Sequence, residues 1–151
     1  MRKKSLIIMA VFGIAVLFAA TGIYAGTTVS DVVKMDNKAY STHKKEIVTF
    51  SHKKHVEDYK AGCGECHHDA SNKPLDGLKA GDNVQGCIEC HKKPGEAPKG
   101  KDAPKLTKKQ KLEYHAEAIH YNCKDCHKKF NQKTDTKAAP TTCAKCHPKK
   151  E

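Results

Sequence analysis

The sequence pattern Cys-x-x-Cys-His occurs four times in this chain, between residues 63 and 147. The copies begin at Cys63, Cys87, Cys123 and Cys143, and together they use all eight cysteines. Two thiols three positions apart can reach the two vinyl groups of one porphyrin, while the adjacent imidazole coordinates its iron. Each copy therefore predicts one c-type haem, and the chain is expected to bind four.

The motifs thus supply the covalent attachment sites and one axial ligand for each iron. The cysteines expected to bind haem are Cys63, Cys66, Cys87, Cys90, Cys123, Cys126, Cys143 and Cys146, and the proximal histidines are His67, His91, His127 and His147.

Paired cysteines can also form zinc sites or disulfides. Two zinc sites built only from cysteine would use every thiol and leave the four adjacent histidines without a role. Thioredoxin-like chemistry expects one reactive Cys-x-x-Cys near a βαβ pattern, which this lysine-rich chain lacks. Covalent haem attachment is the interpretation that accounts for every motif residue.

The N-terminus has the layout of a secretory signal peptide. Arg2, Lys3 and Lys4 precede an apolar run, and small residues follow up to Ala25, where we expect cleavage. An uncleaved membrane anchor is the alternative, because residues 6–25 approach the roughly 20 residues that span a bilayer. Both place the rest of the chain outside the cytoplasm, and the sequence predicts a periplasmic protein without stable membrane insertion once the signal is removed.

Residues 26–151 have the length of one small domain. Their aromatic residues are only Tyr40, Phe50, Tyr59, Tyr114, Tyr121 and Phe130. An ordinary side-chain core can hardly offset the entropy of ordering such a chain. We therefore expect a small, mainly helical and irregular multihaem fold, in which a short N-terminal β-hairpin and short helices surround a four-haem core.

The local patterns locate several elements. Residues 28–33 and 47–50 are rich in β-branched side chains and predict the two strands of the hairpin. A longer helix is expected from Thr107, which can cap it, to about Tyr121. Residues 71–74, 94–104 and 134–142 have the composition of loops.

The chain is strongly basic, and residues 26–151 keep 25 Lys and Arg against 17 Asp and Glu, a net charge of +8. Nucleic acid is one class of partner for such a chain, but export argues against it. Lysines around an exposed haem edge could instead steer an acidic redox partner. Lysines that only keep the chain soluble are the other interpretation.

The second axial ligand of each iron must come from elsewhere in the chain. Met35 is the only methionine after residue 25, so at least three irons cannot use methionine. Six histidines outside the proximal positions are candidates: His43, His52, His55, His68, His115 and His120.

Spacing narrows these candidates. If their segment is helical, His52 and His55 share a face and can reach two neighbouring irons. His68 follows the proximal His67 and points about 100° away from it in a helix, so it is free to bind the next haem. His43 is expected to be exposed to solvent, and one of His115 and His120, with His120 preferred, is expected to be a ligand.

At this point the sequence resembles the class III tetrahaem cytochromes, the cytochrome c3 family. The resemblance spans residues 28 to 147 and depends on three segments: Phe50-Ser51-His52-Lys53-Lys54-His55, Cys63-Gly64-Glu65-Cys66-His67-His68 and Ala118-Ile119-His120-Tyr121-Asn122-Cys123. Many family members have four residues between the cysteines of the second and fourth motifs, whereas both have two here.

The resemblance implies a pairing of axial ligands. Haem 1 would be held by His67 and His52, haem 2 by His91 and His68, haem 3 by His127 and His55, and haem 4 by His147 and His120. All four irons would then be bis-histidine and coordinatively saturated, which disfavours catalysis at the iron.

The resemblance also implies a periplasmic, low-potential electron carrier rather than an enzyme. It would be a monomer that takes electrons from hydrogenase or formate dehydrogenase and passes them to membrane-bound multihaem redox complexes. Two alternatives are a terminal reductase of metal ions or oxyanions with one open haem, and an electron-transfer subunit of a larger multihaem complex. The expected docking lysines near haem 4 are Lys128, Lys129, Lys145, Lys149 and Lys150.

Overall fold

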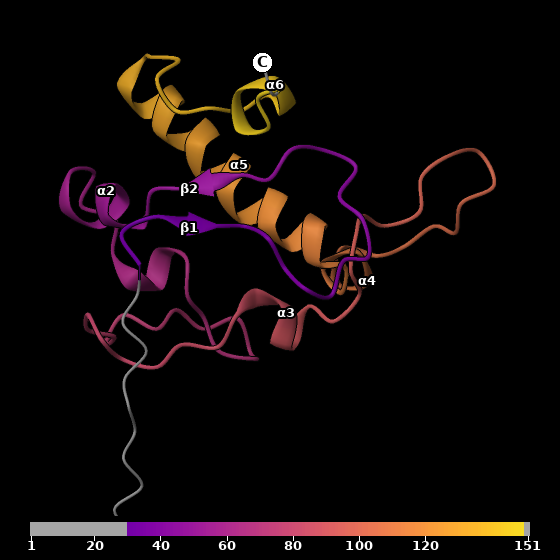
Figure 1. Ribbon diagram of the computed structural model, residues 1–151, viewed down its shortest axis with the longest axis horizontal. Coiled ribbons are helices and arrows are strands. Elements are labelled where there is room, and N and C mark those ends of the chain that lie inside the picture. Colours follow the sequence, from indigo (N-terminus) through magenta and orange to yellow (C-terminus); the bar gives the residue numbers. More distant parts are fainter. Residues whose placement is uncertain (1–29, 150–151) are drawn as a thin grey trace, which may run out of the picture.

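The computed structural model describes residues 30–149, which form short elements joined by long irregular segments (Figure 1). The elements are β1 (Val33–Lys34), β2 (Thr49–Phe50), α2 (His52–Glu57), the 3₁₀ helix η1 (Cys63–Glu65), α3 (Cys87–Cys90), α4 (Lys108–Leu112), α5 (His115–Thr134) and α6 (Cys143–Cys146). This agrees with the small, mainly helical and irregular fold expected from the sequence. The predicted signal peptide, residues 1–25, lies outside the described residues.

The two predicted strands pair only at their C-terminal ends: residues 30–32 are not part of a strand, β1 is Val33–Lys34, and β2 is Thr49–Phe50. β1 and β2 are antiparallel, with Val33 opposite Phe50 and Lys34 opposite Thr49. The Met35 amide donates to the Val48 carbonyl at 2.9 Å and extends this pairing by one bond. Residues 35–48 separate the strands, so they form an open two-stranded ribbon rather than a tight hairpin. The ribbon leads directly into α2 and thereby places the first two candidate axial histidines.

The expected helix from Thr107 to Tyr121 is wrong in two respects, although its cap is confirmed. Thr107 and Gln110 form a capping box at the start of α4. The chain leaves the helical conformation at Tyr114, which has φ −85° and ψ 123°. A second helix, α5, then continues to Thr134 and contains the whole third motif.

Tertiary hydrogen bonds explain this break. The Lys93 amide donates to the Glu113 carbonyl at 3.0 Å, and the His115 amide donates to the Lys93 carbonyl at 2.7 Å. These bonds hold Tyr114 in an extended conformation beside the segment that follows α3. The partner, Lys93, lies 21 residues before Tyr114 in the chain, so helical periodicity around Tyr114 carries no signal of it.

Very little apolar side-chain surface is buried. Among residues 30–149 the buried apolar residues are Ala97 and Ala118, and the buried polar residue is His115. The large apolar or aromatic side chains that remain exposed are Val32, Val56, Tyr59, Tyr121 and Phe130. The polypeptide by itself therefore has almost no apolar core, as its composition predicts.

The long helix α5 organises the rest of the molecule. Figure 1 shows α5 running across the molecule, with α4 at its start and α6 near its far end. It contacts both α3 and α4, and thus brings the second and third motifs close together. Within residues 30–149 no helix is both long and apolar enough to cross a membrane.

Candidate haem-binding site

Each Cys-x-x-Cys-His motif forms a turn of helix. The first, second and fourth motifs make up η1, α3 and α6, and the third lies inside α5. In the first, second and fourth motifs the histidine amide donates to the carbonyl of the first cysteine, at 2.8, 2.9 and 2.7 Å. Residues three positions apart lie on the same face of such a turn. The local backbone therefore presents both thiols of each motif on one side, as attachment to a single porphyrin requires.

The eight cysteines are free thiols, and none of them takes part in a disulfide. Burial raises the pKa of the Cys123 thiol to about 11, and burial also raises the thiol pKa of Cys66 and Cys87. Within residues 30–149, no three His, Cys, Asp or Glu side chains are grouped as the ligands of one metal ion would be.

Three proximal histidines each lie opposite one of the candidate distal histidines. The ring centroids are 6.2 Å apart for His55 and His127 and 6.0 Å apart for His68 and His91. The corresponding distance for His120 and His147 is 6.3 Å. The structure thus brings together three of the pairs implied by the family resemblance.

The fourth implied pair rests on an electrostatic interaction and not on a measured ring contact. The pKa of His67 is lowered, first by burial and then by repulsion from His52 and His68. The ring of His52 lies edge-on to Phe50, with the centroids 6.0 Å apart. His67 and His52 are the pair implied for haem 1.

These centroid distances match two imidazoles on opposite sides of one metal ion. A metal–imidazole bond is about 2.0 Å long, and the ring centroid lies about 1.1 Å behind the bonded nitrogen, so the expected separation is about 6.3 Å. Rings stacked face to face are closer, as Tyr40 and His43 are at 5.1 Å. The spacings of 6.0 to 6.3 Å within the three imidazole pairs are close to the value expected for two ligands of one metal ion.

Backbone carbonyls select the tautomer of five of these imidazoles. The Nδ1 atoms of His55, His68, His91, His127 and His147 lie within hydrogen-bond distance of the carbonyl oxygens of Ser51, Asp69, Leu112, Pro140 and Glu46, respectively. Because a carbonyl oxygen can only accept, Nδ1 carries the proton and the lone pair is on Nε2. This is the tautomer in which imidazole binds a metal through Nε2, with its other nitrogen held by a neighbouring group.

His120 differs from these five in its partner. Its Nδ1 lies 3.9 Å from the Glu96 carboxylate, which in turn is 3.0 Å from the Lys99 amine. Burial lowers the pKa of His120, so the imidazole is neutral at neutral pH, the form that binds a metal. The hydrogen bond from Lys99 lowers the pKa of Glu96 and favours its ionised form.

The two remaining histidines, His115 and His43, both contact Tyr40. His115 is buried, at 6% exposure, and its Nδ1 lies 2.9 Å from the Tyr40 hydroxyl. His43 was expected to be exposed; the residue as a whole is exposed, but its side chain is only 28% exposed, because the ring stacks on Tyr40 and its Nε2 lies 3.2 Å from an Asp36 carboxylate oxygen. Of the two candidates that spacing left open, His120 is the one whose ring contacts that of a proximal histidine, His147.

Sequence reasoning missed the groups that orient the imidazoles. The carbonyls of Glu46, Leu112 and Pro140 are backbone atoms, and no side-chain pattern identifies them. Tyr40 and Glu96 carry suggestive side chains, but their partners lie far along the chain, 75 residues away for Tyr40. No signal in the local sequence could have found these contacts.

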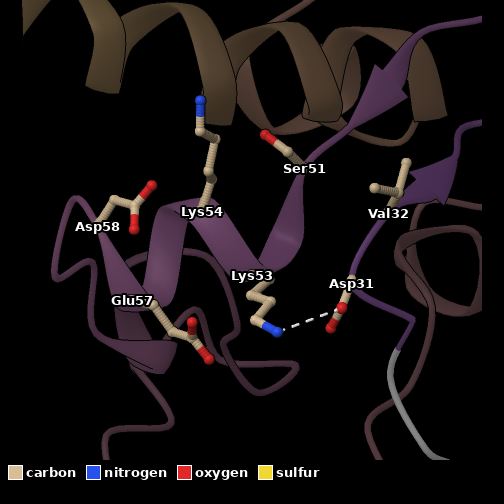
Figure 2. Close-up of a pocket in the computed structure, with 7 residues that line it drawn as sticks. All are labelled: Asp31, Val32, Ser51, Lys53, Lys54, Glu57 and Asp58. Carbon is tan, nitrogen blue, oxygen red and sulfur yellow. Dashed lines mark hydrogen bonds and ion pairs between the residues drawn. The ribbon is translucent and has the colours of Figure 1, made fainter.

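A shallow hollow of about 310 Å³ lies between β1 and α2 and is lined by Asp31, Val32, Ser51, Lys53, Lys54, Glu57 and Asp58. Figure 2 shows the Lys53 amine reaching the Asp31 carboxylate, and the two atoms are 3.4 Å apart. The hollow adjoins α2, the helix that carries His52 and His55. We therefore assign it to the surroundings of the haem site and not to a separate ligand.

Comparison with known proteins agrees with this geometry. The model of the class III cytochrome c family matches residues 28–147 of the chain. The chain belongs to the class III cytochrome c family. No curated protein matches the chain.

Membership confirms the resemblance inferred from the sequence. Class III cytochromes bind several c-type haems and transfer electrons, and the eight cysteines and paired imidazoles of this chain suit that chemistry. The helical turns, the free thiols and the selected tautomers are all properties of this chain's own residues. The residues present therefore fit covalently bound haem.

Proposed function

We propose that this protein is a periplasmic, low-potential electron carrier with four bis-histidine c-type haems. The observation that carries the proposal is the set of three imidazole pairs whose ring centroids lie 6.0 to 6.3 Å apart. A bound haem supplies a reversible one-electron couple at its iron. The protein supplies the attachment points, both axial ligands and the surrounding charges.

The imidazole pairs make electron transfer the expected activity. With a histidine on each side, the iron has no free position for a small substrate, and this disfavours the reductase alternative. Hydrogen bonds from Nδ1 to backbone carbonyls raise the basicity of the ligand and hold the ring plane. Histidine, unlike methionine, as the second ligand also favours a low potential.

A carbon monoxide titration tests this proposal. We expect the reduced purified protein to show the same visible spectrum with and without carbon monoxide, because every iron is saturated. Its intact mass is expected to equal residues 26–151 plus four haems. A spectral response of about one quarter of the haem would instead show an open iron and support a reductase.

The lysines that follow the third motif and those within and after the fourth are the proposed docking surface for the electron donor. Lys128, Lys129, Lys145 and Lys149 are exposed on α5, on α6 and in the chain after α6, and Lys150 lies outside the described residues. Hydrogenase or formate dehydrogenase is the proposed donor, and a membrane-bound multihaem complex is the proposed acceptor.

Ionic strength tests the electrostatic part of this docking proposal. The Debye length shortens from about 30 Å at 0.01 M salt to about 10 Å at 0.1 M. We expect the rate of reduction by hydrogenase to fall at least several-fold over that range, because screening weakens steering. Stopped-flow rates that do not depend on salt would contradict a charge-steered encounter.

A further inference from the structure

Among the histidines proposed as axial ligands, His120 differs in the group that lies beside its Nδ1 atom, which is the Glu96 carboxylate. Five of them hydrogen bond to neutral backbone carbonyls, whereas the Nδ1 of His120 lies 3.9 Å from a carboxylate oxygen of Glu96. This distance is too long for a hydrogen bond. It is nevertheless short enough for an electrostatic interaction, since the carboxylate carries a full charge; the Glu96 side chain is 44% exposed and the His120 side chain is 39% exposed.

The position of Glu96 is determined by backbone contacts. The first amides of α5 have no partner within the helix. Two of them bond to the loop before α4: the His115 amide donates to the Lys93 carbonyl at 2.7 Å, and the Ala116 amide donates to the Gly95 carbonyl at 3.1 Å. Gly95 has φ +87°, a conformation that glycine adopts without strain. Glu96 follows directly, and the next residue, Ala97, is buried.

Lys99 lies on the other side of the same carboxylate. Its amine is 3.0 Å from one Glu96 oxygen and 3.8 Å from a Glu117 oxygen. The negative charge of Glu96 is thus shared between a lysine at the surface and the ring of His120. Removing the Glu96 carboxylate makes the surroundings of His120 less negative, whereas removing the Lys99 amine makes them more negative.

We propose that Glu96 lowers the reduction potential of the haem held by His147 and His120, and that Lys99 limits this effect. Reduction adds one electron from the donor to the ferric iron, and the iron loses one positive charge. A nearby negative charge stabilises the ferric state relative to the ferrous state, and a nearby positive charge does the reverse. This inference rests on the proposed function, because it requires His120 to be an axial ligand.

Two charge-removing variants of the complete holoprotein test the proposal. The four midpoint potentials are measured by an NMR-monitored redox titration, in which the methyl signals of each haem are followed separately. In Glu96→Gln we expect the haem-4 potential to rise by about 59 mV, which corresponds to a tenfold change in its ferric-to-ferrous ratio. In Lys99→Met we expect the haem-4 potential to fall.

The opposite signs separate a charge effect from a structural one. Both substitutions break the same Glu96–Lys99 ion pair, so loss of loop structure would shift haem 4 in the same direction in both variants. Asp36→Asn is the matched control, because Asp36 is 3.2 Å from His43, which faces no proximal ligand. We expect no shift larger at haem 4 than at the other haems in this control.

The results also separate this inference from the proposed function. Equal shifts at all four haems, shifts of the same sign in Glu96→Gln and Lys99→Met, or no shift at haem 4 would overturn the role of Glu96. In each of these cases a wild-type protein with four low-spin, carbon monoxide-insensitive haems would leave the electron-carrier proposal intact. If wild-type haem 4 binds carbon monoxide, the proposed ligation itself is wrong.

Discussion

Residues 26–151 produced without haem attachment will show no cooperative thermal transition. In the part of the chain that the structure describes, the buried apolar side chains are two alanines, Ala97 and Ala118. Each ordered residue costs roughly 1–2 kcal/mol of backbone entropy, which so little buried surface cannot offset. The long helix α5 does not change this, because isolated helices derive little stability without tertiary packing.

The measurement is a thermal melt followed by far-ultraviolet circular dichroism, with the dispersion of amide NMR signals as a second probe. The chain is expressed without its signal peptide in a cytoplasm that does not attach haem. The holoprotein, melted under the same conditions, is the control and is expected to unfold cooperatively. A sigmoidal transition with dispersed amide signals in the haem-free chain would show that the polypeptide has a core of its own.

Replacing His120 with alanine will open one iron, whereas replacing His115 will not. The His120 ring faces that of His147 with centroids 6.3 Å apart, whereas His115 is bonded to the Tyr40 hydroxyl at 2.9 Å. His120→Ala therefore removes an axial ligand, and we expect about one quarter of the haem to become high-spin and to bind carbon monoxide. His115→Ala removes a buried polar contact and is expected to leave four low-spin haems.

The two variants form a matched pair, because the same substitution is made at two histidines of one helix. Electron paramagnetic resonance of the oxidised protein counts the low-spin and high-spin irons, and carbon monoxide binding to the reduced protein counts the open ones. A loss of thermal stability in His115→Ala without a change of spin state is consistent with a structural role for that residue. The assignment fails if His120→Ala retains four low-spin haems and His115→Ala does not.

The accuracy of the sequence-based predictions depends on how local each feature is. The helical turns at the four motifs and the Thr107 cap involve residues three or four positions apart, and the sequence predicted the cap correctly. The end of the helix that begins after Thr107 was predicted wrongly. Tyr114 is held in an extended conformation by Lys93, which lies farther along the chain than the few residues that helical periodicity compares. For the same reason, helical periodicity could not show that α5 continues through the third motif.

The sequence alone determined the number of Cys-x-x-Cys-His motifs, the histidine adjacent to each and the lack of side chains for an ordinary core. These properties follow from residue type and short-range spacing, which do not depend on the path of the chain. The tertiary structure decided which imidazoles face each other and which groups orient them. His147, for example, is oriented by the Glu46 carbonyl, 101 residues earlier, and His120 is paired with Glu96 by a loop bonded to the start of α5. Such contacts form only when segments far apart in the sequence pack together. No local stretch of the chain contains both partners of these interactions, so local sequence patterns cannot predict them.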